Sequence, residues 1–431
     1  MKKRSFHPKN TLHTPLILAP VGDFIALQAA LDNGADEIYF GIQGLNMRAG
    51  AKNFKPTDLS KIVNRCHARN VKALLALNTI IYTHELSLVK KIVREAKIAG
   101  VDAIIAWDGA VINECIQQKI PMHLSTQNSI SNYTSLLHAK KTIPVLTRVV
   151  LARECSLADI KKIIKHIHKN KLDIEIEVFI HGAMCVSVSG RCFMSHELFG
   201  KSANRGECLQ PCRRAYDVTL IDPEEGHTLE LGRDYVMSPK DLCTIEFIDQ
   251  LIDAGIDVFK IEGRNRNPEY VAGVVSQYRK VIDYYVMHHA AIKRDTHARQ
   301  TFTAIKQSAL KELEKVYHRG FSTGFYLGKP VSEFTKEYGS SATQTKQLVG
   351  YITNYYTKIS VAVIKVESTP FKVGDTLIIQ GKTTGSIECP IVGIQYNDSA
   401  ITLATKGFEV SIKINQLVRK NDAVYVIKKK K

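Results

Sequence analysis

The chain alternates short apolar runs with longer amphipathic segments from residue 16 to residue 287. The runs are rich in Val, Ile and Leu, as in strands buried on both faces, and the segments between them have helical periodicity. We predict strands at 16–20, 37–42, 72–78, 102–108, 122–127, 146–152, 174–181 and 258–263. Eight βα units predict an α/β fold, a (β/α)8 TIM-like barrel, with its chemistry at the C-terminal strand ends.

The segment that follows the seventh strand breaks this rhythm. It is far longer than an ordinary βα loop, and five of the nine cysteines lie between residues 185 and 243. Loops of that length are usually functional. Beyond a helix predicted over 267–287, a polar and basic stretch reaches residues 319–324.

The periodicity changes near Lys346, where alternating Val, Ile, Tyr and Thr runs broken by turn residues begin. This pattern predicts a small antiparallel β-barrel. We therefore divide the chain into an N-terminal tail, a barrel that contains a Cys-rich insertion at about 182–237, a linker and a basic β domain. Their bounds are 1–14, 15–330, 331–345 and 346–431.

Composition and charge restrict the class of protein. The chain is 45% hydrophobic and 23% charged, as folded globular proteins are. It has no run of about 18 apolar residues, and its basic N-terminus lacks the apolar core of a signal peptide, so we expect a cytoplasmic protein without a membrane partner. The formal charge of +17 favours RNA, DNA or anionic substrates, although a generally basic surface explains it equally well.

The β domain shares this charge. It holds 13 basic and six acidic residues, which suits a nucleic-acid platform, a spacer or a dimerisation domain.

Four cysteines of the insertion form the clearest chemical signal: Cys185, Cys192, Cys208 and Cys212. Cytosolic thiols stay reduced, so clustered ones suggest a metal rather than disulfides. Four unevenly spaced thiolates can hold a [4Fe-4S] cluster, whereas structural zinc usually uses two short Cys knuckles. Iron-sulfur is the preferred interpretation, with Zn as the alternative.

The other cysteines are expected in the core. Cys243 lies on what we interpret as the inward face of a helix, with a role as substitute ligand as the alternative. Cys66, Cys115, Cys155 and Cys389 stand alone in patterned elements and are expected to pack.

Polar residues at the strand ends are candidates for binding and catalysis. Arg48, Arg153 and Arg264, with Gln127, would converge on one rim and suit a dicarboxylate or phosphate ligand. Glu177 and His181 are four residues apart on one strand and should point to the same side. They could form a metal pair, an acid-base pair or an internal hydrogen-bonded pair.

Several motifs together resemble one bacterial family, the collagenase-like peptidases of unknown catalytic type. The resemblance covers roughly residues 15 to 330, and the β domain looks like the C-terminal domain of the longer members. The motifs are Leu18-Ala19-Pro20-Val21-Gly22-Asp23, Tyr39-Phe40-Gly41, Asn46-Met47-Arg48-Ala49, Ser125-Thr126-Gln127, His181-Gly182-Ala183-Met184-Cys185, Gly190-Arg191-Cys192, Asn204-Arg205-Gly206-Glu207-Cys208 and Lys260-Ile261-Glu262-Gly263-Arg264.

This resemblance implies two different activities. The family name implies proteolysis, whereas better understood relatives hydroxylate a uridine or cytidine in RNA, with prephenate-derived chemistry for transfer RNA, or a quinone ring. Those relatives carry iron-sulfur clusters on cysteines that match the four above. In this sequence His84-Glu85 and His196-Glu197 lack the second His of a metalloprotease, and there is no Gly-x-Ser-x-Gly elbow.

We therefore expect an RNA-modifying hydroxylase. The specific hypothesis is prephenate-dependent 5-hydroxylation of a wobble uridine in transfer RNA, with His181 and Glu177 as catalytic residues and an electron donor protein as partner. The alternative is a peptidase, and a third reading is a non-catalytic RNA-binding scaffold with structural zinc.

Overall fold

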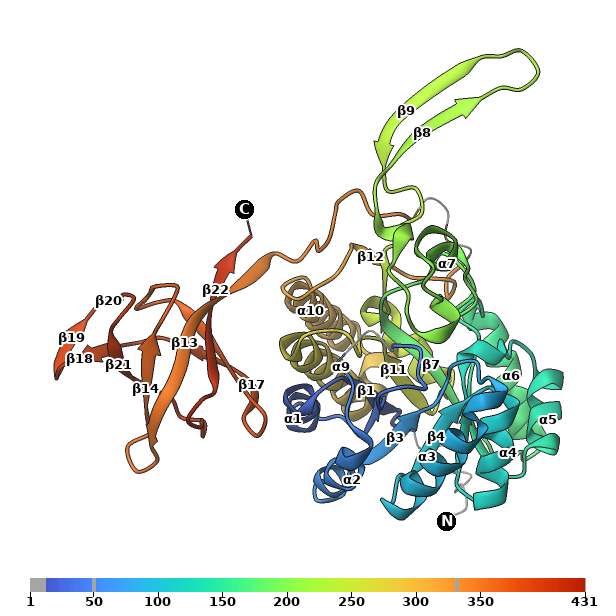
Figure 1. The fold of residues 1–431 in the computed structure, drawn as a ribbon, viewed down its shortest axis with the longest axis horizontal. Helices are drawn as coiled ribbons and strands as arrows, with labels where there is room; N and C mark the ends of the chain where they lie inside the picture. The colour runs from blue at the N-terminus through green and yellow to red at the C-terminus, as the bar shows by residue number, and fades with distance from the viewer. Residues whose placement is uncertain (1–12, 49–51, 329, 331–332, 431) are drawn as a thin grey trace.

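The computed structural model describes residues 13–48, 52–328, 330 and 333–430, so most of the expected tail and part of the expected linker lie outside the described residues. Figure 1 shows a helix-wrapped barrel, a projecting hairpin and a separate β domain. The barrel is closed by eight parallel strands, because β7 pairs with β11 and β11 with β1. They are β1 (Leu16–Val21), β2 (Glu37–Phe40), β3 (Lys72–Ala76), β4 (Ala103–Ala106), β5 (Met122–Leu124), β6 (Leu146–Val150), β7 (Glu175–Gly182) and β11 (Val258–Ile261).

All eight predicted strands are therefore confirmed, most with slightly shorter bounds. The helices around the barrel begin at polar caps: Asp23 accepts hydrogen bonds from two backbone amides of the first helix, and Ser156 accepts one from Asp159. The helices are α1 (Phe24–Asp32), α2 (Leu59–His67), α3 (Leu86–Ile98), α4 (Gly109–Gln118), α5 (Tyr133–Thr142), α6 (Leu157–Lys169), α8 (Ile248–Asp253), α9 (Pro268–Arg294) and α10 (Thr296–Leu313).

The end of the barrel differs from the prediction. The last predicted helix continues to Arg294, and the polar stretch after it forms α10. Only Phe302, Ala309 and Leu313 of α10 are buried, because the helix lies on the outside of α9. Because only these few positions are apolar and many of the others are Lys, Arg or Gln, the helical periodicity of this segment is weak in the sequence.

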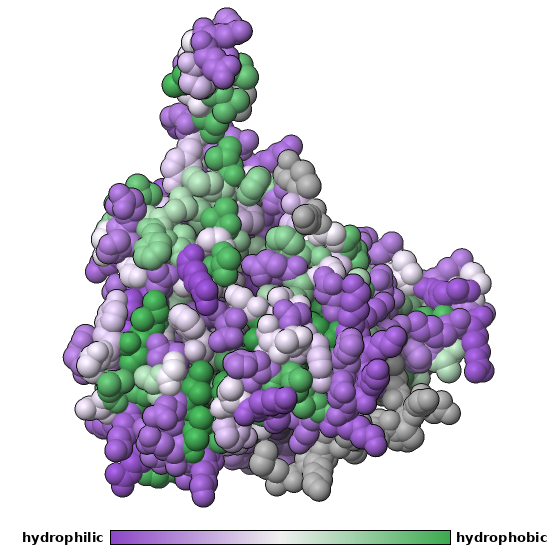
Figure 2. Space-filling view, turned by 90° about the vertical axis from the view of Figure 1, so that its right-hand side faces the viewer, coloured by the Kyte–Doolittle hydropathy of each residue, from purple (hydrophilic) through white to green (hydrophobic). Residues whose placement is uncertain are grey.

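The Cys-rich insertion forms a small cap with one helix, α7 (Met194–Phe199), and a hairpin of β8 (Tyr216–Ile221) and β9 (Thr228–Asp234) that projects from the barrel (Figure 1). Exposed apolar side chains gather in the cap, and Figure 2 shows apolar residues at the foot of the hairpin. The exposed apolar residues of the cap are Val186, Val188, Phe193, Leu198 and Leu209. After the insertion, β10 (Asp241–Cys243) pairs antiparallel with β7, and β12 (Phe321–Ser322) pairs with β10.

The C-terminal domain is an antiparallel β structure, as predicted. Eight of its strands form one sheet in the order β17-β16-β22-β13-β14-β21-β18-β19 around an apolar core of their own. The strands are β13 (Gln344–Tyr356), β14 (Val361–Val366), β15 (Phe371–Lys372), β16 (Thr376–Gly381), β17 (Gly385–Pro390), β18 (Ile394–Tyr396), β19 (Ser399–Ile401), β20 (Leu403–Ala404), β21 (Glu409–Lys413) and β22 (Ala423–Lys429).

This domain is attached to the barrel through α1 and α9. Glu269 of α9 accepts hydrogen bonds from Lys346 Nζ at 3.0 Å and from Gln380 Nε2 at 2.8 Å. The β16–β17 turn approaches α1 so closely that a Cβ at Gly385 would lie 3.2 Å from the backbone nitrogen of Ala29. Gly385 also has a φ of +74°, which favours glycine. None of the helices in the described part of the chain is long and apolar enough to cross a bilayer.

A buried charge network closes the lower half of the barrel interior. Arg148 is fully buried and forms ion pairs with Glu37 at 2.5 Å and Glu177 at 3.2 Å. Lys260 Nζ donates to the other carboxylate oxygen of Glu177 at 2.6 Å. The network therefore joins four strands, β2, β6, β7 and β11, by paired charges where a barrel usually has apolar side chains.

Replacing Arg148 with Met should destabilise the protein by about 3–5 kcal/mol, because it removes a buried cation from two buried carboxylates. Glu37 would then keep only Lys72, and Glu177 only Lys260. Urea unfolding followed by circular dichroism measures this loss. Lys91→Met is the control: it removes an exposed pair with Glu95 at 3.9 Å and should cost less than about 1 kcal/mol. A loss at Arg148 as small as the control's would show that the network contributes little.

The network should also make stability depend on pH. Burial raises the pKa of Glu37, but Arg148 and Lys72 outweigh it and lower the pKa from 4.5 to about 2. The contribution of Glu37 is thus complete above pH 4.5 and is lost as the pH falls towards 2. Glu37→Gln should be less stable than wild type at pH 7 and lose less stability over this interval, as urea midpoints would reveal. Glu230→Gln, on the exposed hairpin, should keep the wild-type profile.

Candidate active-site pocket

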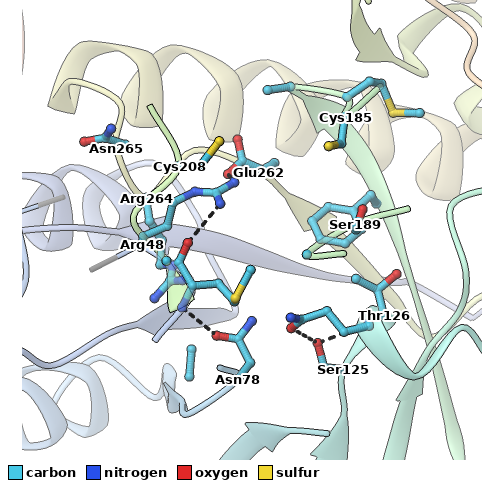
Figure 3. A pocket seen from close by; sticks show the side chains of 18 of the residues that line it. Arg48, Asn78, Ser125, Thr126, Cys185, Ser189, Cys208, Glu262, Arg264 and Asn265 are labelled. Carbon is cyan, nitrogen blue, oxygen red and sulfur yellow. Dashed lines mark hydrogen bonds and ion pairs between the residues drawn. The ribbon is translucent and has the colours of Figure 1, made fainter. Parts of the chain in front are cut away.

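A pocket of about 510 Å³ opens at the C-terminal ends of the barrel strands (Figure 3), where the fold places active sites. We call it the rim pocket. Its wall includes Cys185, Cys208 and Cys212 from the insertion. Seven basic and two acidic residues line it, so it favours anions. The barrel strands supply its floor, with Tyr39, Ala76, Ile105, Val150, Phe179 and Lys260.

Arg48 forms the open side of the rim. Its Nη2 lies 2.9 Å from Glu262 Oε1, its Nη1 donates to the Met47 carbonyl at 3.1 Å, and 40% of its side chain remains exposed. Burial raises the pKa of Glu262, but the surrounding arginines, Arg48 first among them, outweigh burial and lower it. Glu262 is therefore ionised and holds Arg48 in place, while the rest of the guanidinium can bind a ligand.

Arg264 lies deeper. Its Nη1 donates at 3.2 Å to Asn46 Oδ1, and Asn46 is itself held by a 2.6 Å hydrogen bond to the Ile42 carbonyl. A Cβ at Gly41 would lie 2.5 Å from Arg264 Nη1, so only glycine leaves room for this guanidinium. Burial lowers the pKa of Arg264 to about 10, and the group stays cationic at neutral pH.

Arg153 carries donors that the protein does not use. Its Nη1 donates to the Ala183 carbonyl at 2.9 Å and its guanidinium lies 4.5 Å from the centre of the Phe179 ring, but its Nε and Nη2 are buried without a partner. Gln127 Nε2 is also buried and unpartnered, while Gln127 Oε1 accepts from Ser125 at 3.0 Å. Buried donors without partners are costly, so these three atoms point to a ligand that accepts hydrogen bonds.

All four rim residues expected from the strand ends, the three arginines and Gln127, thus line one pocket. Their role in binding remains a prediction. The second expectation fails, because Glu177 and His181 do not face the same side. β7 shifts register between its pairings with Lys260 and Ile261, so Ile180 is an extra residue and the alternation breaks before His181.

His181 consequently turns away from the barrel interior. Its ring lies 5.6 to 5.9 Å from the rings of Tyr278, Phe321 and Tyr270. Burial lowers the pKa of His181 to about 3, so the ring is neutral. Glu177 instead lies below the pocket, between Arg148 and Lys260. Neither residue lines the rim pocket, and the two do not form a metal or acid-base pair.

The four cysteines of the insertion lie close enough to act on one another. Burial raises the pKa of Cys212, and the neighbouring charges of Cys185, Cys208 and Cys192 raise it further, while Arg213 lowers it. Within the described ranges, no three His, Cys, Asp or Glu side chains converge on one position that could hold a single metal ion. The four thiols are nonetheless neighbours, and four thiols are a donor set that iron-sulfur clusters and structural zinc both use.

Cys243 lies apart from this set. It belongs to strand β10, not to a helix as expected, and its Sγ is 3.8 Å from the Tyr278 hydroxyl in the barrel core. Burial raises the pKa of Cys243 to about 12. The expectation of core packing is confirmed, and a role as substitute ligand does not fit this position. The isolated Cys66, Cys115, Cys155 and Cys389 are likewise buried.

Residues 22–336 match the family described as Peptidase family U32. The chain belongs to this family. A collagenase of Porphyromonas gingivalis is 40% identical over 95% of this chain and 97% of its own length. The tRNA hydroxylation protein P1 of Bacillus subtilis is 36% identical over 84% of this chain and 82% of its own. The 23S rRNA 5-hydroxycytidine C2501 synthase of Escherichia coli is 33% identical over 75% and 49%.

Four basic pocket residues of this U32 protein were not foreseen from the sequence: Lys201, Arg213, Lys260 and Arg319. Lys260 lies on the floor, 5% exposed, two residues before Glu262 and four before Arg264. All three line the pocket, Lys260 from β11 and the other two from the chain just after that strand, and their spacing of two residues was the available signal. A single lysine within an apolar strand is easily overlooked, because the aliphatic part of the lysine side chain packs like a core residue.

The unused donors of Arg153 predict how the pocket binds an anion. Arg153→Gln should weaken the binding of malonate, a dicarboxylate, by about 10- to 100-fold, because charged hydrogen bonds contribute about 1.5–3 kcal/mol. Isothermal titration calorimetry measures the change, with Arg94→Gln on the exposed face of α3 as the charge-matched control. Equal affinities in both variants would show that Arg153 does not contact the ligand.

Proposed function

We propose that this U32 protein hydroxylates a pyrimidine base of RNA. In its specific form, the proposal is that it adds the hydroxyl at C5 of a wobble uridine in transfer RNA, with prephenate as co-substrate and a [4Fe-4S] cluster as cofactor. The observation that carries it is the rim pocket, where thiols on the wall face cationic donors without partners. This combination provides for a redox cofactor and an acidic co-substrate side by side.

The first part of the proposal, the acidic co-substrate, rests on the arginines. Prephenate carries two carboxylates, and an arginine fork matches a carboxylate with two parallel hydrogen bonds. Arg153 offers Nε and Nη2 without a competing protein partner, and Gln127 Nε2 offers another donor in the same pocket. Arg48 is partly exposed and lies beside the deeper Arg264 (Figure 3), so a second carboxylate could bind there.

The second part of the proposal, the cofactor, rests on four cysteines that would hold the cluster: Cys185, Cys192, Cys208 and Cys212. When bound, an iron-sulfur cluster supplies one-electron redox chemistry. Burial raises the pKa of Cys208 and of Cys212, and the nearby Arg48 and Arg213, respectively, offset only part of that rise. The exposed apolar residues of the cap surround these cysteines in sequence and would suit the docking of an electron donor protein.

The third part of the proposal, the RNA substrate, rests on the net charge of the chain and on the names of its relatives. The chain carries +17, and two relatives described above are named for hydroxylation of transfer or ribosomal RNA. A base inside folded RNA reaches a pocket of this kind only when it is unstacked. The basic β domain would bind the RNA backbone while the base enters the rim pocket of the barrel. We propose the cytoplasm as the location of this reaction.

Proteolysis is the second candidate, because a relative 40% identical over 95% of the chain is named a collagenase. The pocket offers little for peptide hydrolysis. Among its described lining residues there is no histidine to serve as general base or zinc ligand. The cysteines of the wall lie beside arginines instead.

Metal analysis after purification without oxygen tests the proposal. The wild type should contain about four iron and four sulfide per chain, and Cys192→Ala should lose most of both. Cys389→Ala, which changes a buried cysteine of the β domain, should keep them. Mass spectrometry of transfer RNA from a deletion strain should show loss of the hydroxylated uridine, restored by the wild type and by Cys389→Ala but not by Cys192→Ala.

Iron-free wild-type protein, or unchanged transfer RNA in the deletion strain, would contradict the proposal. Digestion of gelatin by purified protein, absent in Cys208→Ala, would move peptidase activity ahead of it.

A further inference from the structure

The floor of the rim pocket contains one charged side chain. Of the six strand residues that form it, five are uncharged at neutral pH and the sixth is Lys260. Its Nζ lies 4.5 Å from the ring centre of Tyr39 and 5.4 Å from that of Phe179. An ammonium group between two aromatic rings, 5% exposed, is shielded from water on most sides.

Lys260 is also where the buried charge network meets the pocket. Arg148, Glu37 and Glu177 belong to the network but do not line the pocket, whereas Lys260 does both. A lysine that served only to neutralise Glu177 would not need to reach the cavity, since Arg148 already pairs with that carboxylate. Burial lowers the pKa of Lys260, opposed by Glu177 and reinforced by Arg148 and Arg264. Shielding and neighbouring cations are the usual means of activating an amine.

We propose that Lys260 is a nucleophilic amine that forms an imine with a 2-oxo carboxylate bound in the rim pocket, its carboxylate held by Arg153. The carboxylate would accept hydrogen bonds from the free Nε and Nη2 of Arg153, which leaves the ketone for the floor. For its natural substrate this inference rests on the proposed function, because prephenate carries a 2-oxo carboxylate side chain.

The step is balanced without an oxidant. Glu177, 2.6 Å from Nζ, takes one proton from the ammonium group, and the free amine attacks the ketone carbon. The resulting hydroxyl takes that proton back and leaves as water, so a C=N bond replaces the C=O bond. The products are the iminium and one water molecule, and Glu177 returns to its carboxylate form. The iminium then withdraws electrons from C3 of the bound acid and weakens its bonds there.

Borohydride trapping tests the inference. Purified full-length protein is incubated with pyruvate as the probe, reduced with sodium borohydride, and mapped by peptide mass spectrometry. The expected result is a reduced pyruvate adduct on Lys260, absent without pyruvate. Lys260→Arg keeps a cation beside Glu177 and should lose the adduct, while Lys165→Arg, on the exposed face of α6, should leave it unchanged. Arg153→Gln should lower the yield at limiting pyruvate.

No adduct on Lys260 in the wild type would overturn the inference whether or not the variants fold. Adducts spread over exposed lysines, and unchanged in Lys260→Arg, would overturn it as well. Prephenate-dependent hydroxylation that is undiminished in Lys260→Arg would also overturn it and leave the proposed function standing. An adduct on Lys260 in a protein that does not modify RNA would support the inference and count against the proposed function.

Discussion

The structure depends on charges that are paired inside the barrel. Without Arg148, two buried carboxylates would each keep a single cation: Glu37 would keep Lys72, and Glu177 would keep Lys260. Because Arg148 and the two carboxylates lie on β6, β2 and β7, and Lys260 adds β11, one set of ion pairs fixes the relative positions of half the barrel strands. Such networks are often no more stabilising than apolar packing, but they tolerate little displacement of their partners.

The same network determines what the pocket can be. Lys260 is held at the floor by Glu177, and the chain that follows its strand leads to Glu262 and Arg264 at the rim. The floor is shielded and partly aromatic, whereas the rim is cationic and reaches solvent through Arg48. The cationic rim and the buried cation at the floor together favour an anionic ligand. The names of the relatives point in two directions, to a collagenase and to RNA hydroxylation.

Much of this was predictable because it depends on short-range pattern. The eight strands follow from apolar runs, and the rim residues follow from the rule that strand ends share one edge. The rule failed where the backbone departs from strict alternation. One extra residue, Ile180, turns His181 outward, and no feature of residues 175–182 announces that bulge. Cys243 and α10 were misassigned for a related reason, since short or weakly amphipathic elements take their form from the surface they pack on.

The attachment of the β domain adds a constraint on any RNA substrate. Glu269 accepts hydrogen bonds from Lys346 and Gln380, and it lies in the first turn of α9, which starts four residues after Arg264. The contact that orients the β domain is therefore only five residues from the rim of the pocket. RNA held by the basic β domain would be positioned relative to the pocket through a helix rather than a flexible linker. With an RNA substrate, a rigid connection of this kind would select RNA by the distance between the bound backbone and the base to be presented, so recognition of shape would precede recognition of the base.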